Sequence, residues 1–541
     1  MGDEDSRMAN HLFYGDNLEV LRDHLKTESV DLIYLDPPFN SHATYNVLFR
    51  SPAGAQSQAQ IEAFLDTWQW SDSSERAFDE VMQSGNSDVS EMLRAFRSFM
   101  KESDMMAYLT MMAVRLIELH RILKPTGSLY LHCDPTASHY LKILLDGIFG
   151  AEGFRDDIVW KRAETVKGNF GQGSKFFDRN TDSILFYAKS NTQKFHPQFK
   201  PYTQQYIDDF YKFKESDGRI YRLISMIGPG GASKGNPEYE VLGVRRHWRY
   251  SKQKMNDLIA AGMVVQTNPG SVPQRKLYLD QGKGVPVQSL WDDIPALHSQ
   301  SGERLGYPTQ KPLALLERIV ETSSDPGDVV LDPFCGCGTA VHAAQKLGRS
   351  WIGIDITHLA ISLIEKRLND AFPGLAFEVH GTPKDLDGAR KLADQDKYQF
   401  QWWAVSLVNA IPYGGKKKGA DSGIDGFIYF KPEGKVTEKA IVSVKGGSNV
   451  SVAMIRDLGH VIEREKAKIG VFITLAEATK PMQTEALKAG FFETPFGKYP
   501  KIQILTIADL FAGSKPDIPL VDPSVFRKAA VELNVKQNEL F

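Results

Sequence analysis

Apolar runs of strand length alternate with helical stretches in the N-terminal part of the chain. Residues 11–14 and 30–35 are such runs, and leucines recur at helical spacing between them. A longer helical pattern over 105–123 is followed by a loop at 124–127 and by another apolar run at 128–133. Because alternating strands and helices build parallel sheets covered by helices, the pattern predicts an α/β fold.

The same alternation returns later in the chain after a long interruption. Residues 329–331 and 351–354 are apolar runs, and a helical stretch at 339–347 separates them. Residues 191–299 lack this rhythm and are rich in basic and aromatic residues, so we expect a substrate-recognition region there. The Gly-rich segment 161–180 also mixes basic and aromatic residues, which suits either a loop that contacts nucleic acid or a solvated loop.

The composition is that of a globular protein with several domains. The 541 residues exceed one ordinary core, and 42% are hydrophobic and 24% charged. The net charge of −3 neither favours nor excludes nucleic acid as a partner. No apolar stretch is long enough for a membrane span, and the acidic N-terminus lacks the apolar core of a signal peptide. Three cysteines fit a reducing cytoplasm, and Cys335-x-Cys337 has no partner pair for zinc.

The segment Asp36-Pro37-Pro38-Phe39 ends the apolar run 30–35 abruptly. Each proline fixes φ at about −65° and lacks an N–H group, so neither a strand nor an ordinary helix continues there. The result is a rigid, extended segment that carries a carboxylate and an aromatic ring at the carboxyl edge of the sheet, where open α/β sheets bind ligands. Taken alone, the segment is equally well a structural turn.

A Gly-rich turn follows the run at 329–331. It reads Asp332-Pro333-Phe334-Cys335-Gly336-Cys337-Gly338, and Asp355 ends the next strand. Glycines allow a tight turn and a close approach to a ligand, and an acid at the end of the second strand is placed for ribose hydroxyls. The turn is not G-x-G-x-x-G, and Asp332 at its head disfavours a pyrophosphate. A cationic ligand such as S-adenosylmethionine therefore fits better than NAD.

The two segments together resemble the amino-group DNA methyltransferases. The catalytic segment, here at Asp36, precedes the cofactor segment at Asp332, with the recognition region between them, as in the permuted β class. The segment Tyr307-Pro308-Thr309-Gln310-Lys311 resembles the remaining cofactor motif of that family. The resemblance covers roughly residues 10–370 and implies a Rossmann-like, S-adenosylmethionine-dependent methyltransferase sheet.

The resemblance implies a role for each motif residue. Within the catalytic segment Asp36-Pro37-Pro38-Phe39, the Asp36 carboxylate and the Pro37 carbonyl would accept hydrogen bonds from the exocyclic amine of a flipped base, and Phe39 would stack on that base. No covalent nucleophile is required. The cofactor would contact Asp332, Phe334, Gly336 and Gly338 with its methionine part, Thr309 and Lys311 with its carboxylate, Asp355 with its ribose and Asp16 with its adenine.

The resemblance favours adenine N6 as the methylated atom. Aspartate at the first catalytic position is usual for adenine, and serine for cytosine N4; Phe39 stands where tyrosine is commoner. Cytosine-N4 methylation is the alternative, and a DNA-binding protein with an inactive methyltransferase fold is disfavoured because the motifs are intact. We expect double-stranded DNA as partner, no membrane, a cytoplasmic location and a restriction–modification or phage-defence role; a homodimer is left open.

The pattern restarts after residue 397 with a helix, two strands and a further helix–strand–helix–strand order. Asp421 and Asp425, followed by a strand that carries Ser443-Val444-Lys445, resemble the Mrr-like branch of the PD-(D/E)xK nucleases, a smaller α/β restriction-endonuclease-like fold. The resemblance implies that Asp425 and Asp421 bind Mg²⁺ and that Lys445 helps to activate water. Ser443 stands where the family has Glu or Gln, so a nuclease and a domain that only binds DNA are both retained.

These patterns define the expected domain organisation. The expected segments are a catalytic half at 10–190 with an insertion at about 51–104, a target-recognition region at 191–299, a cofactor-binding half at 300–380, an endonuclease-like domain at 398–515 and a tail at 516–541.

Overall fold

The computed structural model describes most of the chain. The described residues are 10–38, 44–50, 56–65, 69–163, 175, 177, 179–298, 301–305, 307, 309–413, 423–432 and 436–519. Two compact units divide them: one contains the described residues up to His196 and from Ser289 onward, and the other is Pro197–Gln288. None of the described helices is both long and apolar enough to cross a membrane.

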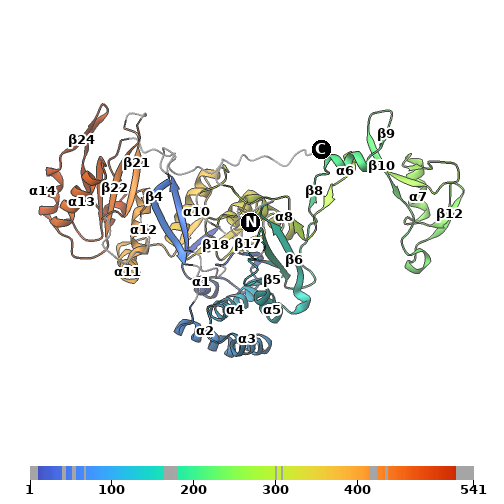
Figure 1. The fold of residues 1–541 in the computed structure, drawn as a ribbon, viewed down its shortest axis with the longest axis horizontal. Helices are drawn as coiled ribbons and strands as arrows, with labels where there is room; N and C mark the ends of the chain where they lie inside the picture. The colour runs from blue at the N-terminus through green and yellow to red at the C-terminus, as the bar shows by residue number, and fades with distance from the viewer. Residues whose placement is uncertain are drawn as a thin grey trace, which may run out of the picture. The chain divides into compact units, whose positions relative to one another are not determined.

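A nine-stranded sheet forms the centre of the first unit (Figure 1). The described strands lie in the order β16 (Leu290–Trp291), β6 (Phe154–Lys161), β7 (Thr181–Ala188), β5 (Leu123–Cys133), β2 (Val30–Leu35), β17 (Val329–Asp332), β18 (Ser350–Asp355), β1 (His11–Tyr14) and β19 (Glu378–His380). The run from β5 to β19 is parallel, whereas β7 pairs antiparallel with β5 and β6. This arrangement confirms the predicted α/β class.

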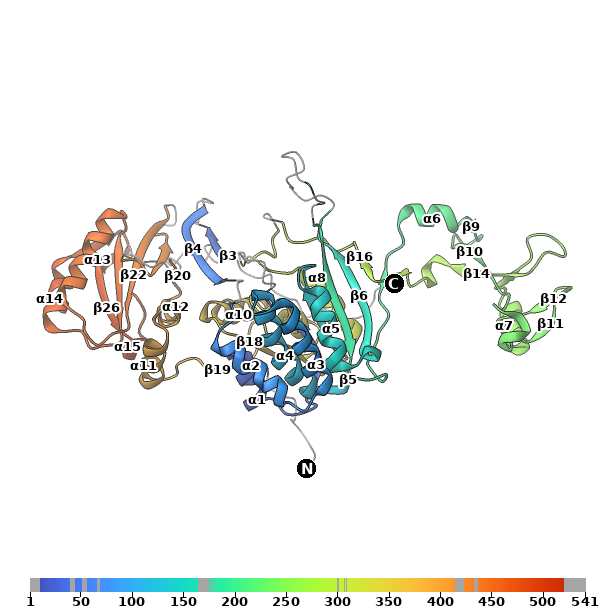
Figure 2. The same ribbon diagram turned by 60° about the horizontal axis from the view of Figure 1, so that its bottom comes forward.

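Helices cover both faces of this sheet (Figure 2). Leu129 and Leu131 of β5 share a buried core with α1 (Asn17–His24), α4 (Asp104–Ile122) and α5 (Ser138–Phe149). Tyr130 points to the opposite face because side chains alternate along a strand, and its hydroxyl lies 2.7 Å from Ser323 of α8 (Leu313–Ser323). The helix α9 (Thr339–Lys346) contacts the sheet at β17 and β18, and α10 (His358–Ala371) contacts it at β18 and β1.

The pairing of β2 with β17 joins the two predicted halves of the methyltransferase sheet. Leu32 is in register with Val330, and Ile33 is in register with Leu331. The carboxyl ends of both strands therefore reach the same edge of the sheet, although about 300 residues separate them in the sequence. This register places Asp36, which follows β2, and Asp332, which ends β17, at one site.

The structure corrects one predicted connection and adds a hairpin. Residues 124–127, predicted as a loop, belong to β5, where the pairing with β2 shifts between Leu123 and Ser128. Extended backbone suits Pro125, so a β-bulge accommodates it without ending the strand. A hairpin begins before the predicted insertion with β3 (Thr44–Arg50) and continues into it with β4 (Gln56–Leu65). The helices α2 (Asp72–Gln83) and α3 (Ser87–Met100) follow within the insertion.

The second unit is built from short strands around a small core. Met226, Trp248 and Met255 are fully buried in it. Its strands are β8 (Phe199–Lys200), β9 (Phe213–Lys214), β10 (Ile220–Ser225), β11 (Glu238–Val241), β12 (Val244–His247), β13 (Val264–Val265), β14 (Gln274–Tyr278) and β15 (Val285–Pro286), and its helices are α6 (Gln204–Phe210) and α7 (Lys252–Ala260).

The C-terminal part has its own five-stranded sheet with apolar cores on both faces. Its strands lie in the order β20 (Ile411–Pro412), β21 (Gly426–Phe430), β22 (Glu438–Lys445), β23 (Ile469–Thr474) and β26 (Ile502–Thr506). The helices are α11 (Leu386–Gln395), α12 (Lys397–Leu407), α13 (Val452–Arg464), α14 (Lys480–Lys488) and α15 (Ile507–Phe511), and β24 (Phe491–Thr494) pairs with β25 (Gly497–Pro500).

Candidate active site

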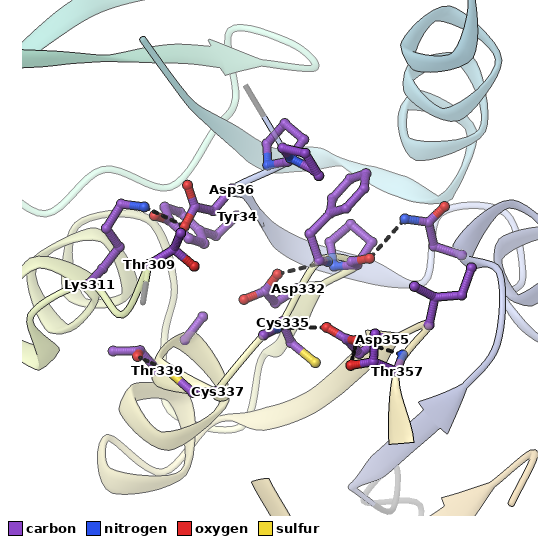
Figure 3. Close-up of a pocket in the computed structure, with 18 of the residues that line it drawn as sticks. Tyr34, Asp36, Thr309, Lys311, Asp332, Cys335, Cys337, Thr339, Asp355 and Thr357 are labelled. Atoms are coloured by element: carbon purple, nitrogen blue, oxygen red, sulfur yellow. Dashed lines mark hydrogen bonds and ion pairs between the residues drawn. The ribbon is translucent and has the colours of Figure 1, made fainter. Parts of the chain in front are cut away.

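A cavity of about 380 Å³ lies at the carboxyl ends of β1, β2, β17 and β18 (Figure 3). This volume is within the range of small-molecule sites, roughly 300–1,000 Å³. The predicted site residues that line it are Asp16, Asp36, Pro37, Pro38, Thr309, Lys311, Asp332, Phe334, Gly336 and Asp355. The sequence therefore identified residues that the fold brings together at one site. Phe39 lies outside the described residues.

Asp36 forms an ion pair with Lys311 inside the cavity. The Lys311 Nζ donates to Asp36 Oδ2 at 2.5 Å, and the two side chains are only 12% and 16% exposed. The resemblance implied that Lys311 lies near the carboxylate of a cofactor, and that role stays a prediction. In the structure, Lys311 instead fixes the position of the carboxylate that is predicted to hold the target base.

Asp332 is the most buried carboxylate of the cavity, at 4% exposure. Burial raises the pKa of Asp332 well above its ordinary value, and the nearby carboxylates of Asp36 and Asp355 raise it further. An anionic ligand such as a pyrophosphate would be repelled by these groups, whereas a cationic ligand would stabilise their ionised forms. The cavity therefore favours a ligand with positive charge.

Asp355 links the two strand ends on the other side of the cavity. Its Oδ2 accepts a hydrogen bond from Gly336 N at 2.9 Å, and its Oδ1 accepts from the backbone N and the hydroxyl of Thr357 at 2.8 and 2.9 Å. Burial raises the pKa of Asp355 to about 6. A carboxylate has about four acceptor positions, so Asp355 can still accept a hydroxyl of a bound ribose.

The glycine turn between β17 and α9 needs its glycines. Gly336 and Gly338 have φ values of +51° and +74°. A Cβ atom on Gly336 would lie 3.1 Å from Tyr307 Cε1, and one on Gly338 would lie 2.8 Å from Ile364 Cγ1. Gly336 lines the cavity directly, whereas Gly338 lets α10 pack closely against the start of α9.

Arg115 and Asn17 complete one wall of the cavity and were not predicted. The guanidinium of Arg115, 6% exposed, donates to both carboxylate oxygens of Asp16 at 3.0 Å and to Asn17 Oδ1 at 2.6 Å. Asn17 in turn donates to the carbonyl of Pro333 at 2.9 Å. The sequence feature that could have indicated this network is an arginine in the middle of an apolar helical stretch. These bonds tie the loop after β1 to the glycine turn.

A second unpredicted network lies beneath Asp36. His132 is fully buried, and its ring nitrogens lie 3.1 Å from the hydroxyl of Tyr34 and 3.2 Å from Asp182 Oδ2. Tyr34 also lines the cavity. The sequence feature that could have indicated this network is a histidine in the apolar run at 128–133. The network connects β2, β5 and β7 at the carboxyl ends of β2 and β5.

The cavity fits S-adenosylmethionine. The acidic residues suit the positive charges of a sulfonium and an α-amino group, Asp355 is placed for a ribose, and the positive-φ glycines leave room where a Cβ would intrude. Open α/β sheets bind their ligands at this carboxyl edge, and the acidic lining favours S-adenosylmethionine over a dinucleotide, which is the pattern of an S-adenosylmethionine-dependent methyltransferase.

The chain belongs to the DNA methylase family, whose members methylate an N6 or N4 exocyclic amine of DNA. The sequence model of this family matches residues 30–366, more than half of the chain. A second model, described as restriction endonuclease, matches residues 392–494. Both predicted resemblances are thereby confirmed, as is S-adenosylmethionine as the cofactor.

Individual relatives support the same family. The type II methyltransferase M.EcaI of Enterobacter cloacae is 29% identical over 367 residues, which cover 66% of this chain and 69% of that protein. The Mod subunit of the type III restriction-modification enzyme StyLTI of Salmonella typhimurium is 28% identical over 362 residues, which cover 64% of this chain and 51% of that protein. The chain thus spans about half the length of the second relative.

The C-terminal domain places Asp425 beside the strand that carries Ser443 and Lys445. Asp425 Oδ2 accepts a hydrogen bond from Val444 N at 2.6 Å, and Ser443 is 5% exposed. Side chains of residues two apart lie on one face of a strand, so Ser443 and Lys445 share a face of β22. Asp421 lies outside the described residues, as does most of the basic and aromatic segment 161–180.

We expect the affinity for S-adenosylmethionine to depend on pH through Asp355. Below pH 6 Asp355 is increasingly protonated in the free protein, because its pKa is about 6. A protonated carboxyl is a weaker acceptor for ribose hydroxyls, so the affinity falls with decreasing pH by up to about tenfold per unit. Calorimetric titrations of wild type and Asp355→Asn from pH 5 to 8 measure this; equal slopes in both proteins would contradict it.

The raised pKa of Asp355 also affects the stability of the ligand-free protein, with a pH dependence opposite in sign to that of cofactor affinity. The folded pKa of Asp355 lies above the ordinary value of 3.8, so the folded state holds more protons than the unfolded state between about pH 4 and 6. The contribution of Asp355 to the free energy of unfolding is therefore largest at low pH and is lost as the pH rises through about 6.

Proposed function

We propose that the protein transfers a methyl group from S-adenosylmethionine to N6 of adenine in double-stranded DNA, in a restriction–modification or phage-defence system. The observation that carries this proposal is the position of Asp36, held by Lys311 at the edge of a cavity that suits the cofactor. The relatives named in type II and type III systems support the biological setting.

Asp36 can hold the target amine while Lys311 holds Asp36. Lys311 occupies Oδ2 of the carboxylate, and a carboxylate has about four acceptor positions, so further positions accept an N–H of the base. The Pro37 carbonyl would accept the second N–H. Two acceptors in these positions withdraw the amine lone pair from conjugation with the ring and orient it toward the cavity.

When bound, the cofactor supplies an electrophilic methyl group on its sulfonium. The residues around it hold the reactants in place. Asp332 and Asp355 orient the charged groups and the hydroxyl groups of the cofactor, and the rigid Pro37-Pro38 segment fixes the distance to the base. Holding two reactants at attack distance contributes several kcal/mol to catalysis, up to about 7–11 kcal/mol in well-oriented systems. The base must leave the duplex to enter the site, and Phe39 is proposed as its stacking partner.

The choice of adenine rests on the aspartate at position 36. In the resembling family this residue accompanies adenine N6, whereas serine accompanies cytosine N4. The Asp36 carboxylate and the Pro37 carbonyl can accept hydrogen bonds from either amine, so cytosine N4 remains the second candidate.

The unit Pro197–Gln288 is proposed as the region that recognises the DNA sequence. It carries fourteen Lys and Arg against eight Asp and Glu, a charge of +6 in a chain with a net charge of −3. Arg245, Arg246 and Arg249 are exposed on and beside the β11–β12 hairpin. Cationic side chains neutralise phosphates and release counterions, so this surface suits DNA. The predicted domain boundaries and the homodimer remain predictions.

Sequencing of DNA from cells that express the chain tests the proposed function. Single-molecule sequencing reports both the modified base and its surrounding sequence. We expect N6-methyladenine in one short motif, absent from cells that express Asp36→Ala. N4-methylcytosine in a motif would support the second candidate, and unmodified DNA in both strains would contradict both.

We propose that the C-terminal domain binds DNA without cutting it. Serine is a poor Mg²⁺ ligand compared with the carboxylate or amide oxygens that Mg²⁺ prefers, and Ser443 is buried beside Asp425. We therefore expect unmethylated plasmid to remain intact with Mg²⁺ and the full chain, while gel-shift assays show binding. Cutting that requires Mg²⁺ and is lost in Lys445→Ala would instead establish a nuclease.

A further inference from the structure

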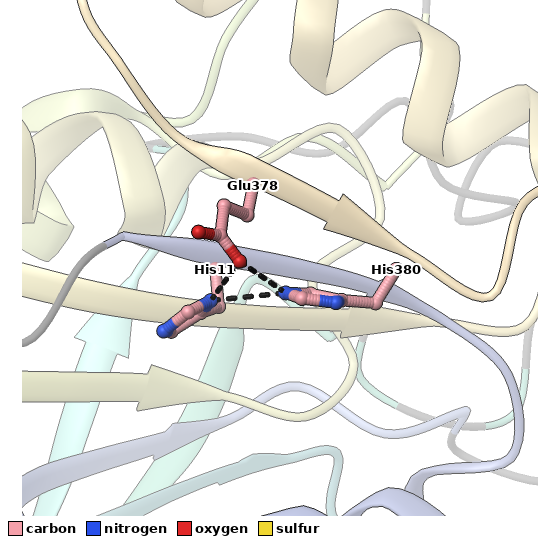
Figure 4. Close-up of side chains that lie close together, drawn as sticks. All are labelled: His11, Glu378 and His380. Carbon is pink, nitrogen blue, oxygen red and sulfur yellow. Dashed lines mark hydrogen bonds and ion pairs between the residues drawn. The ribbon is translucent and has the colours of Figure 1, made fainter.

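Three side chains with metal-ligating atoms meet at the edge of the large sheet (Figure 4). They are His11 of β1 and Glu378 and His380 of β19. His11 Nδ1 lies 3.0 Å from His380 Nε2 and 3.8 Å from Glu378 Oε2, and His380 Nε2 lies 3.4 Å from Glu378 Oε2. No residue of this cluster lines the cofactor cavity.

The backbone itself brings these side chains together. In the parallel pair β1–β19, His11 is in register with Glu378 and Phe13 is in register with His380. Side chains two residues apart point to the same face of a strand, so Glu378 and His380 lie on one face beside His11. The ring of His380 also stacks on that of Phe13, with centroids 4.5 Å apart, which restricts its orientation.

The distances match the ligand polyhedron of a zinc ion. Tetrahedral ligands at about 2.0–2.1 Å from zinc lie about 3.3 Å from one another. The three observed separations, 3.0, 3.4 and 3.8 Å, lie on both sides of that value. Two imidazoles and a carboxylate are also a donor set that zinc accepts, with a fourth position open to water.

Solvent can reach the cluster. The side chains of His11 and His380 are 26% and 30% exposed, and that of Glu378 is 62% exposed. A metal ion can therefore enter without opening the fold. The cluster lies at the amino end of β1, four residues or about 13 Å along the chain from Gly15 at the cofactor cavity.

We propose that His11, Glu378 and His380 form a binding site for Zn²⁺ that fastens β19 to the sheet. β19 has only three residues and lies at the sheet edge, held by β1 alone among its described neighbours. A metal ion bound by side chains of both strands cross-links them. Because the chain continues from β19 into α11 of the C-terminal domain, the ion fixes the point from which that domain starts.

Metal titration of the untagged full chain tests this site. After removal of metal with a chelator, Co²⁺ is added as a spectroscopic probe, and Zn²⁺ is then added as a competitor. We expect one equivalent of Co²⁺ to bind with the visible absorption of a nitrogen- and oxygen-ligated ion, Zn²⁺ to displace it, and Zn²⁺ to raise the melting temperature.

Variants locate the ion. His380→Ala is expected to weaken binding at least tenfold and to remove the shift in melting temperature, and Glu378→Gln to weaken binding to a smaller extent. His380→Gln retains a hydrogen-bonding side chain next to His11 and serves if His380→Ala does not fold. The exposed His139→Ala is the control and should bind as wild type does.

Two results would overturn the proposal. One is the absence of stoichiometric Co²⁺ or Zn²⁺ binding to the folded wild type. The other is binding that persists unchanged in folded His380→Ala or His380→Gln, because the ion would then lie elsewhere in the chain.

Discussion

Replacing Asp36 by alanine is expected to lower the rate of methyl transfer by about 10²- to 10⁴-fold, the usual contribution of one positioned group at a reacting proton. The carboxylate is the acceptor that would hold the amine at the edge of the cavity, and the alanine cannot accept a hydrogen bond. Cofactor affinity should change much less, since Asp36 contacts the base in this account. Single-turnover methyl transfer and calorimetric titration with S-adenosylmethionine separate the two effects.

Asp134→Ala is a matched control for this variant. Asp134 follows the neighbouring strand β5 as Asp36 follows β2, but it does not line the cavity and instead accepts hydrogen bonds from Thr136. Its removal should leave the rate within a factor of about three, because its side chain does not line the cavity. An Asp36→Ala enzyme that methylates DNA at the wild-type rate would exclude Asp36 as the base-holding group.

The second large effect is expected for Gly338→Ala, which should weaken cofactor binding by at least about tenfold and also destabilise the fold. The residue has φ of +74°, and its Cβ would lie 2.8 Å from Ile364 Cγ1. Left-handed backbone costs an alanine about 1–2 kcal/mol. The contact with Ile364 adds to that cost by pushing α10 away from the turn whose backbone lines the cavity.

Gly348→Ala is the control that separates the effect of the left-handed backbone from the effect of the contact with Ile364. Gly348 has nearly the same φ, +73°, but no atom lies within 4 Å of the position of its Cβ. It should lose about 1–2 kcal/mol of unfolding free energy and keep its cofactor affinity. Urea unfolding and calorimetric titration of both variants measure the difference. Equal cofactor affinities for Gly338→Ala and wild type would show that the close packing at Ile364 does not shape the cavity.

The sequence predicted the strands that build the site because each is a short, mostly apolar segment, with a carboxylate at or just after its end. Asp36 and Asp332 could be placed at strand ends from local pattern, and parallel pairing then brought the ends together. The pairing of Lys311 with Asp36 could not be predicted, since it joins residues 275 positions apart and depends on the path of the chain before α8. Arg115 and His132 were hidden in apolar runs, where a polar residue gives no indication of its partner.

Other parts of the fold could be predicted less well from the sequence. The proline in residues 124–127 indicated a loop, yet the strand tolerates it at a bulge because the pairing register shifts there. In the unit Pro197–Gln288 the strands have two to six residues, too short for a reliable period of two. The cluster of His11, Glu378 and His380 combines His11 with residues 367 and 369 positions away, so no spacing motif could reveal it.

Mass analysis of nucleosides from DNA methylated in vitro is the most direct test of the proposed chemistry. The full chain is incubated with unmodified double-stranded DNA and S-adenosylmethionine carrying a labelled methyl group, beside Asp36→Ala and Asp134→Ala, and the DNA is digested to nucleosides. The account predicts labelled N6-methyladenine with wild type and Asp134→Ala and almost none with Asp36→Ala. Label on N4 of cytosine alone, or equal label on adenine with Asp36→Ala, would contradict it.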